Sequence, residues 1–443
     1  MGILEKAMQM LTEHPLCNHC LGRQFALLGY GAENMDRGKA IKLLLTMGGH
    51  QLTLSEGKTG IALLKTVASN GSFEMARDIL KRFNKRAPAK RACCLCDGRF
   101  ERINALVKKA VNELENYEFA TFLVGVELSL EVAEREDEFK ANFNVTHGES
   151  MKSQFSRDIG KEICEITNRE VDYGKPDIVV LVKPFTNGIR LQINSLFIAG
   201  RYKKLVRGIP QSRWLCGKCN GRGCESCNWT GKKYQESVEE LIGIPMLELA
   251  EGQEIAFHGA GREDIDARML GSGRPFVLEV KEPKKRFIDL QRLENAINER
   301  ARGKVEVHNL RFADKDVVRQ VKKAEAAEKV YCVIMEFSRN VSGEELEDVE
   351  RMLSNVTVRQ QTPQRVLHRR ADLIREKYIY KAKVKRLAHN RAEMQIRCQG
   401  GLYIKELVTG DEGRTKPSVA SIIDIKATPL QLDVLSVVAG EEK

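Results

Sequence analysis

Apolar residues recur three and four positions apart in several N-terminal segments, and this spacing places them on one face of a helix. In the first segment, Ile3, Ala7 and Leu11 share such a face. The same spacing predicts helices over residues 1–13, 34–47, 103–116 and 150–167. A serine at position 150 is placed to cap the last of these helices.

Three further segments of this half have the pattern of strands rather than helices. Residues 120–130 read as a buried strand, residues 177–183 are rich in β-branched side chains, and residues 188–197 alternate polar with apolar. The dipeptide Asn187-Gly188 between the last two is typical of a hairpin turn. A hairpin is therefore predicted over residues 177–197.

The C-terminal half mixes short helices with many strands. Helices are predicted over residues 236–251, with a turn near Pro245, and over 288–302 and 343–353. Strands are predicted over residues 276–282, 305–312, 330–337, 357–361, 366–370, 378–387, 393–399 and 402–407. This order predicts the α+β class, with a mixed, mainly antiparallel sheet flanked by helices.

Residues 259–276, GAGREDIDARMLGSGRPF, follow neither period. They contain three acids, three arginines and four glycines. Neighbouring arginines favour the ionised form of an acid, and glycines allow the backbone to approach a ligand closely. The segment is thus suited to presenting a carboxylate to a polyanion, although a solvated charged loop has a similar composition.

Composition points to the same kind of partner. The chain has 443 residues, with 72 basic against 61 acidic residues and a net charge of +11. This length predicts two or three domains, and the basic excess favours a nucleic acid over a membrane. We find no signal-peptide pattern and no apolar run long enough to span a bilayer, so a cytoplasmic location is expected.

The twelve cysteines are better explained as metal ligands than as disulfides in such a chain. Two C-x2-C pairs, seventy residues apart, could close one zinc site, although two pairs of buried reduced thiols fit the same pattern. Cys94 lies inside the second pair, which leaves open which neighbouring cysteine is a ligand. The proposed ligands of this first set are Cys17, Cys20, Cys93 and Cys96.

A second set has the compact spacing C-x2-C-x4-C-x2-C, which can enclose one Zn²⁺ locally. Four cysteine ligands leave no open coordination position, so both sites are predicted to be structural. The ligands of this second set are Cys216, Cys219, Cys224 and Cys227.

The resemblance of one segment to a known family makes the expected function more specific. Residues 261–275, GREDIDARMLGSGRP, resemble the active-site loop of tRNA pseudouridine synthases, in the family that modifies uridines 54 and 55 and carries a THUMP domain. The resemblance implies that Asp264 is the catalytic nucleophile and that Arg262, two residues before it, is its partner. Asp266 is the alternative catalytic acid.

Residues 401–418, GLYIKELVTGDEGRTKPS, resemble a second signature of the same family. The family contacts its target nucleoside through tyrosines that match Tyr331 and Tyr403. A basic residue of this signature pairs with the catalytic acid, and both Arg414 and Lys405 are candidates.

The resemblance also implies a domain plan. Residues 1–100 form a four-cysteine zinc-binding region and residues 101–200 a THUMP-like α/β module. Residues 201–235 form a basic linker with the second zinc knuckle, and residues 236–443 form the catalytic domain.

We therefore predict a tRNA pseudouridine synthase acting on uridine 54, uridine 55 or both. It would bind tRNA, use Zn²⁺ structurally, need no organic cofactor and act as a monomer with no inferable protein partner. Two alternatives are a non-catalytic zinc-dependent RNA-binding protein and another THUMP-type tRNA modification enzyme. The first leaves the clustered acids unexplained, and the second lacks the cofactor loop that methylation or thiolation would require.

Overall fold

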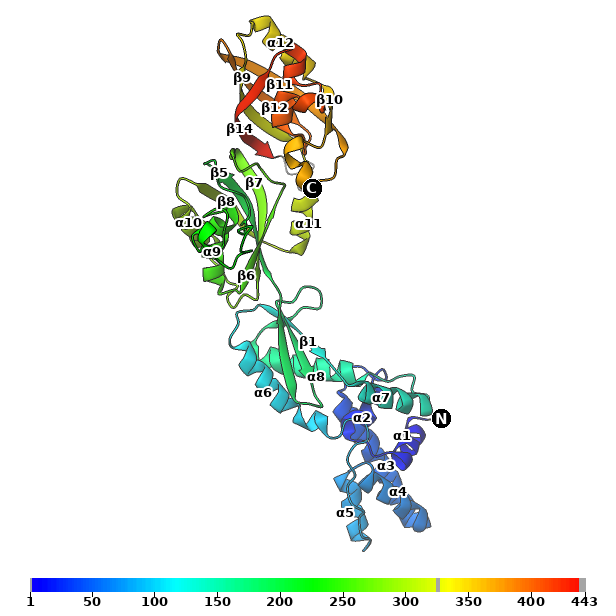
Figure 1. Ribbon diagram of the computed structural model, residues 1–443. Helices are drawn as coiled ribbons and strands as arrows, with labels where there is room; N and C mark the ends of the chain where they lie inside the picture. Colours follow the sequence, from blue (N-terminus) through cyan, green and yellow to red (C-terminus); the bar gives the residue numbers. More distant parts are fainter. Residues whose placement is uncertain (1, 324–326, 438–443) are drawn as a thin grey trace. The chain divides into compact units, whose positions relative to one another are not determined.

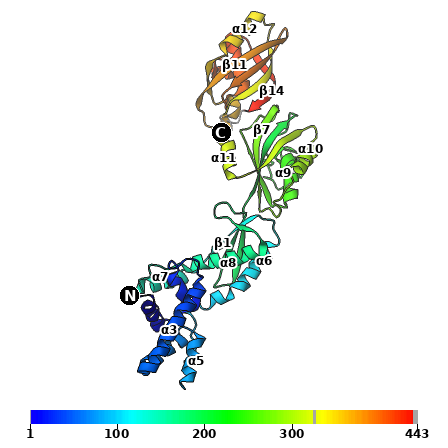
Figure 2. The ribbon, with the colours of Figure 1, turned by 180° about the vertical axis from the view of Figure 1, so that it is seen from behind.

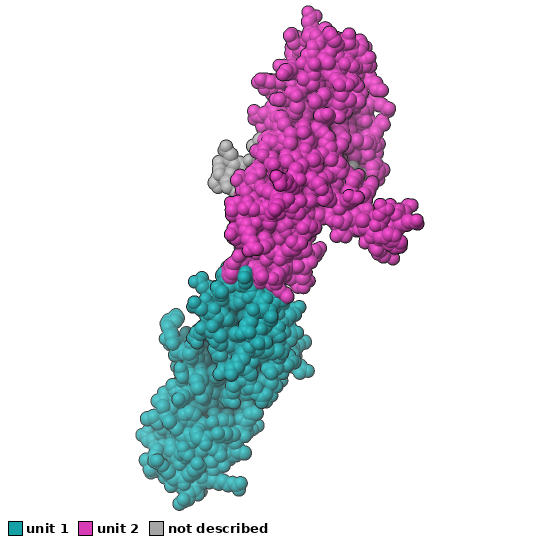
Figure 3. All heavy atoms as spheres, turned by 90° about the vertical axis from the view of Figure 1, so that its left-hand side faces the viewer, with its two compact units in different colours: residues 1–194 teal, residues 195–443 magenta. Residues whose placement is uncertain are grey.

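The computed structural model describes residues 2–323 and 327–437. The chain divides into two compact units, Met1–Asn194 and Ser195–Lys443, which are coloured separately in Figure 3. Each unit is considered by itself below. Across the described residues, every helix is too short or too polar to cross a lipid bilayer.

The N-terminal part of the first unit is helical. Its helices are α1 (Ile3–Glu13), α2 (Asn18–Gly22), α3 (Asn34–Glu56), α4 (Lys58–Ser69) and α5 (Glu74–Arg82). Helices α2 and α3 approach so closely that a Cβ on Gly38 would lie 2.0 Å from the carbonyl oxygen of Asn18. Only glycine permits this approach, which fixes the helix that carries the first cysteine pair.

The rest of the first unit is an α/β module built on a four-stranded sheet of order β2-β1-β3-β4. Its strands are β1 (Thr121–Val126), β2 (Glu170–Val171), β3 (Ile178–Lys183) and β4 (Gly188–Ile193), and its helices are η2 (Arg99–Arg102), α6 (Ile103–Leu114), α7 (Leu130–Asn142) and α8 (Met151–Thr167). The hairpin prediction is confirmed, since β3 and β4 pair antiparallel, with Ile178 opposite Ile193 at one end and Lys183 opposite Gly188 at the turn. The Ser150 cap is also confirmed, because its side chain accepts a hydrogen bond from the Ser153 amide.

The second unit contains a ten-stranded sheet, which runs β13-β10-β11-β12-β9-β14-β7-β5-β8 with β6 added beside β7. Its strands are β5 (Leu196–Lys204), β6 (Glu254–Gly259), β7 (Ala267–Lys281), β8 (Val305–Ala313), β9 (Lys329–Phe337), β10 (Val356–Gln361), β11 (Ile374–Ala388), β12 (Arg391–Cys398), β13 (Thr415–Lys416) and β14 (Ala427–Val437). All neighbours pair antiparallel except β14 and β7. The α+β class with a mainly antiparallel sheet is confirmed.

Helices cover this sheet in two groups. The first group, α9 (Val238–Ala250) and α10 (Leu290–Arg300), packs on the end formed by β6, β7 and β8 in both ribbon views (Figures 1 and 2). The second group, α12 (Gly343–Met352), α13 (Ile404–Thr409) and α14 (Val419–Ile423), packs on the end formed by β11 and β14. Helix α11 (Lys315–Lys323) contacts β6 and β7.

Strand β7 changes partner along its length. Along one edge its start pairs in parallel with β14, with Ala267 opposite Leu432, and its end pairs antiparallel with β6, with Phe276 opposite Gly259. Strand β5 pairs antiparallel along the other edge. Between the parts paired with β14 and β6, Gly271 has a φ of 57°, and a Cβ there would lie 2.0 Å from the carbonyl oxygen of Leu435. Glycine is therefore required where the strand passes from one partner to the other. The functional site lies beside this point.

Several predicted boundaries are wrong. The linker predicted to begin at residue 201 does not begin there, because β5 runs from Leu196 to Lys204 inside the large sheet. The chain leaves the first unit at residue 194 instead. The half of segment 259–276 that begins at Ala267 is strand β7 rather than loop, since its irregular side-chain pattern reflects changing partners along one edge.

Three local predictions also fail. Pro245 lies inside the continuous helix α9 instead of at a turn. The strand predicted over 366–370 is the 3-10 helix η5 (Gln364–Arg369), and that predicted over 402–407 is largely helix α13. Short apolar runs fit either period, and in these places packing against the sheet decides the outcome.

Candidate active site

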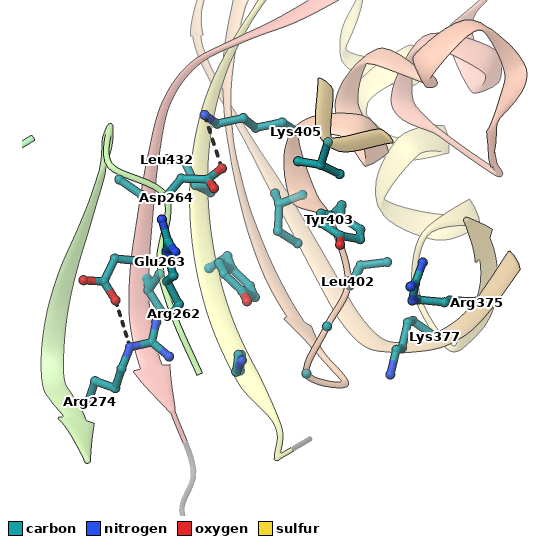
Figure 4. A pocket seen from close by; sticks show the side chains of 18 of the residues that line it. Arg262, Glu263, Asp264, Arg274, Arg375, Lys377, Leu402, Tyr403, Lys405 and Leu432 are labelled. Atoms are coloured by element: carbon teal, nitrogen blue, oxygen red, sulfur yellow. Dashed lines mark hydrogen bonds and ion pairs between the residues drawn. The ribbon is translucent and has the colours of Figure 1, made fainter. Parts of the chain in front are cut away.

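A cleft of about 640 Å³ opens beside the point where β7 meets β14. Segments far apart in the sequence line it: the loop that precedes β7, helix α11, strand β9, η5 and the turn before α13. Each contributes a side chain that can bind or react, namely Asp264, Lys323, Tyr331, Arg365 and Tyr403. Asp264 and Tyr403 are labelled in Figure 4.

The loop that carries Asp264 rests on a buried ionic network. The Glu263 carboxylate is fully buried and accepts a hydrogen bond from Arg274 Nε at 2.9 Å (Figure 4). The hydroxyl of Tyr202 donates to the same carboxylate at 2.9 Å, and Arg274 also donates to the Ala260 carbonyl at 2.6 Å. Buried charges with satisfied hydrogen bonds fix a single geometry. The carboxylate next to Asp264 therefore anchors the loop instead of reacting.

Two further side chains donate hydrogen bonds to the backbone of this loop. Lys204, on β5, is buried and donates to the carbonyls of Asp264 at 3.1 Å and Ile265 at 3.2 Å. Gln211 donates to the carbonyl of Gly261 at 2.9 Å. The backbone on both sides of the catalytic candidate is thus held by residues that precede the second cysteine set.

The Asp264 carboxylate points into the cleft toward two cations. It lies 3.2 Å from the guanidinium of Arg365 and 3.4 Å from the ammonium of Lys405. Its side chain is 35% exposed, so it is reachable from the cleft yet not freely solvated. Such charge-assisted pairs orient a carboxylate toward a ligand in the cleft.

Arg365 is itself fixed by a second acid. Its Nε donates to Glu406 at 2.7 Å, and the Glu406 side chain is only 6% exposed. Burial lowers the pKa of Arg365, but the hydrogen bond to Glu406 and the charge of Asp264 outweigh it, so the pKa is raised. Arg365 therefore remains charged beside Asp264. The sequence analysis did not single out Arg365, which directly precedes the strand predicted over residues 366–370.

Asp266, the alternative acid, lies in a different environment. Its side chain is 66% exposed and is hydrogen-bonded to Lys405 at 2.6 Å. Burial raises the pKa of Asp266, but the Lys405 hydrogen bond and charge outweigh this effect and the pKa is lowered. Asp266 thus orients Lys405 at the rim, while Asp264 faces the cleft. Lys405, one of the two candidates for the basic partner, contacts both Asp264 and Asp266.

Arg262 does not contact Asp264, contrary to the prediction from the R-x-D spacing. Its guanidinium lies over the ring of Trp214, 5.2 Å from the ring centroid, and no ion pair joins it to an acid among the described residues. Residues two apart on this loop point in different directions, and Trp214 offers Arg262 an aromatic face. The ionic partners of Asp264 come from distant segments instead.

The other basic candidate, Arg414, is not among the residues that line the cleft. Its guanidinium donates to the Thr362 carbonyl at 2.8 Å and to Asp372 at 2.5 Å. Arg414 therefore ties together the loops around η5, and of the two candidates in this signature only Lys405 reaches Asp264.

Both predicted tyrosines line the cleft. Tyr331 lies on β9, opposite Val434 of β14, and burial raises its pKa, so its hydroxyl remains protonated. The Tyr403 hydroxyl accepts a hydrogen bond from Arg370 at 2.9 Å. Leu432 of β14, which the sequence analysis did not single out, lines the same wall. These side chains give the cleft apolar surfaces on which a planar base could pack.

The rest of the lining is strongly cationic. Besides the residues discussed above, it includes Lys322, Lys323, Lys329, Arg370, Arg375 and Lys377. Among the described residues of the lining, the carboxylates are Glu263 and Asp264, and the first is neutralised by Arg274. This excess of positive charge suits a polyanionic substrate such as RNA.

The first cysteine set converges in the first unit. Its four sulfur atoms all lie within 4.8 Å of one another, with 3.6 Å between those of Cys17 and Cys96. A tetrahedral zinc–thiolate site places its sulfurs about 3.8 Å apart. Cys20 also accepts a hydrogen bond from buried Arg23 at 3.1 Å, which suits a thiolate. Cys94 is not a member of this set.

The second set converges between β5 and α9. Its sulfurs lie 3.9 Å apart for Cys216 and Cys224, and 3.8 Å apart for Cys219 and Cys227. Backbone amides donate to two of them, including Gly223 to Cys219 at 3.2 Å. Both sets could therefore hold a metal ion with four thiolate ligands.

Two family models match this chain. A family model described as Pus10, C-terminal matches residues 197–438, and one described as Pus10 THUMP domain, archaeal matches residues 106–183. Among solved structures, a Cbf5-Nop10-Gar1 complex aligns at 12% identity over 53% of this chain and 47% of that chain, with a TM-score of 0.30, which is too low to support an argument.

Curated relatives match over nearly the full length. A tRNA pseudouridine synthase Pus10 of Methanothrix thermoacetophila is 42% identical over 437 residues, which cover 98% of this chain and 94% of that protein. The corresponding protein of Methanocaldococcus jannaschii is 45% identical over 438 residues, which cover 97% and 93%. This chain therefore belongs to the Pus10 family of tRNA pseudouridine synthases, which are isomerases.

Proposed function

We propose that this enzyme converts uridine 54, uridine 55 or both of tRNA to pseudouridine, with Asp264 as the catalytic carboxylate. The observation that carries the proposal is the position of Asp264, which faces the cleft between the cations of Arg365 and Lys405. The family is enzymatic, so the non-catalytic RNA-binding alternative is set aside. No feature of the cleft favours a different modification.

The reaction is an isomerisation that needs no redox partner. The N1–C1′ bond of uridine breaks, the base turns, and C5 bonds to C1′. The hydrogen on C5 is released as a proton and N1 gains one, so the overall composition does not change. To reach the carboxylate, the target base must leave its stack, as other base-modifying enzymes require.

Each cleft residue has a role in this scheme. Asp264 acts on the ribose or the base, either as a nucleophile or by stabilising a glycal-forming step. Arg365 and Lys405 pair with that carboxylate and orient it toward the substrate. Tyr331 and Leu432 flank the extracted base, and the outer cations bind neighbouring phosphates.

We propose Zn²⁺ as the metal for both cysteine sets. Four thiolates at tetrahedral spacing suit Zn²⁺, and a bound ion would cross-link each fold and take no part in the reaction. Reduced cysteines and a tRNA substrate also favour a cytoplasmic location. One chain supplies the whole cleft, so we propose a monomer that works without a protein partner.

Mapping the modification on an unmodified tRNA transcript tests the proposal. After incubation, carbodiimide labelling followed by primer extension should stop at position 54, 55 or both, and transcripts with cytidine at either position should identify which. Asp264→Asn is the matched control and should give no stop. A change in tRNA mass would contradict isomerisation.

A further inference from the structure

The second cysteine set sits on a short stem that touches the catalytic loop. Leu215 and Lys232 form an isolated β-bridge at its base, and the Lys233 amide donates to the Trp214 carbonyl at 2.9 Å. The loop between Leu215 and Lys232 contains all four cysteines and the 3-10 helix η3 (Glu225–Cys227). Closure of the cysteine set therefore holds the two sides of the stem together.

Trp214, at the base of this stem, is the contact point. Its ring lies under the Arg262 guanidinium at 5.2 Å, and the Lys233 ammonium lies 5.2 Å from the same ring. Tyr234 packs edge-on against Trp214, with 5.6 Å between ring centroids. Cation–aromatic contacts of this kind are attractive and directional. The stem and the catalytic loop thus meet through one aromatic ring.

Arg262 is exposed and lines the cleft that contains Asp264. Since it forms no ion pair with an acid among the described residues, the Trp214 ring is the contact that sets its direction. A guanidinium that is oriented but not neutralised remains available to an incoming phosphate. Its charge is thus directed toward the substrate and away from the catalytic carboxylate.

We infer that Trp214 is a positioning residue for Arg262, and that a filled second cysteine set holds Trp214 in place so that Arg262 binds a backbone phosphate of the RNA. The inference rests on the proposed function for the identity of the substrate. It predicts that the stem controls tRNA affinity more than the chemical step.

Steady-state kinetics separate this role from a catalytic one. Arg262→Ala should raise KM for tRNA about tenfold and lower the salt dependence of binding by roughly one phosphate contact, with a smaller effect on kcat. Trp214→Ala should act similarly, whereas Trp214→Phe, which keeps an aromatic face, should restore most of the affinity. The double variant should be no worse than Arg262→Ala, because the two residues act as one unit.

Tryptophan fluorescence gives a readout independent of activity. The chain has two tryptophans, so Trp229→Phe leaves Trp214 as the single reporter. In that background, Arg262→Ala should shift the Trp214 emission, and Cys224→Ser with Cys227→Ser should shift it further and weaken tRNA binding.

Unchanged Trp214 emission in Arg262→Ala would overturn the inference, as would additive losses in the double variant. A loss of kcat at unchanged KM would also overturn it. These results are separate from the proposed function, which fails if Asp264→Asn remains active or if the mass of the tRNA changes.

Discussion

The Asp264 carboxylate lies 3.2 Å from the guanidinium of Arg365, a residue 101 positions later in the chain. The two come together because η5 and the catalytic loop face the same cleft. Glu406 holds Arg365 from the other side, at 2.7 Å. Glu406 thus positions Arg365, and Arg365 orients the Asp264 carboxylate that we propose as catalytic.

Removing the charge of Arg365 should lower kcat by about 10- to 100-fold, because a charge-assisted hydrogen bond contributes about 1.5–3 kcal/mol. Arg365→Ala also leaves buried Glu406 without its guanidinium, so some loss of stability is expected. Arg365→Lys keeps the charge and should recover part of the rate. Single-turnover rates on saturating tRNA measure the effect.

The matched control for this experiment is Arg375→Ala. Arg375 lines the same cleft but donates to Thr362 at 2.8 Å. It should weaken tRNA binding without an equal loss of the single-turnover rate. Equal rate losses in both variants would show that general charge, and no specific pairing with Asp264, supports catalysis.

Substitution should distinguish the roles of Asp264 and Asp266. Asp264→Asn removes the carboxylate that faces the cleft. It should lower the rate of tritium release from 5-tritiated uridine in tRNA by at least about a thousandfold. Asp266→Asn frees Lys405 at the rim and should retain measurable activity. The reverse order of losses would assign the catalytic role to Asp266.

These contacts define the limit of what the sequence reveals. The C-x2-C spacing predicts the second four-cysteine set locally, whereas the first set, whose two pairs are remote in the chain, was predicted from the same spacing together with the family resemblance. Alternation along the chain likewise predicts most strands of the large sheet. Arg365 was not predicted as a partner of Asp264, because only the folded sheet brings η5 to the catalytic loop.

The pairing of Arg262 with Asp264 failed for a related reason. Sequence proximity suggested a contact, but Trp214, forty-eight residues earlier by its number, takes the guanidinium instead. Glu263 shows a further limit. In the sequence, Glu263 is an acid like its neighbour Asp264. Only the burial of Glu263 against Arg274 shows that Glu263 anchors the loop and does not react.

Metal content offers a test of the cysteine sets. The purified protein should contain two zinc ions per chain, measured by elemental analysis against protein concentration. Cys224→Ser with Cys227→Ser should leave one. Cys17→Ser should also reduce the content, and it should lower the melting temperature because the first set packs into a hydrophobic core.

The control for the metal test is Cys94→Ser, which changes a cysteine beside the first set but outside it. This variant should keep both ions. A loss of zinc in Cys94→Ser at unchanged content in Cys93→Ser would exchange the two cysteines in the ligand set.

Asp433 links the parallel strands β7 and β14, which lie beside the site. On β14, it accepts hydrogen bonds from Arg268 of β7 at 2.6 Å and from Arg207 at 2.6 Å. Its side chain is 13% exposed. Asp433→Asn should lower the free energy of unfolding by about 1–2 kcal/mol, toward the lower end because both arginines are partly exposed. Chemical denaturation at neutral pH measures the loss.

The effect of Asp433 should depend on pH in a defined direction. Burial raises the pKa of Asp433, but the Arg268 hydrogen bond and the charges of Arg207 and Arg268 outweigh it, and the pKa is lowered. Its folded-state pKa is thus below the unfolded value of about 3.9, so its stabilisation is fully present above about pH 4 and is lost as pH falls through the folded pKa. The difference between wild type and Asp433→Asn should be constant from about pH 5 to 8 and shrink below about pH 4. A difference that grew on acidification would mean that Asp433 is not held as a carboxylate by these arginines.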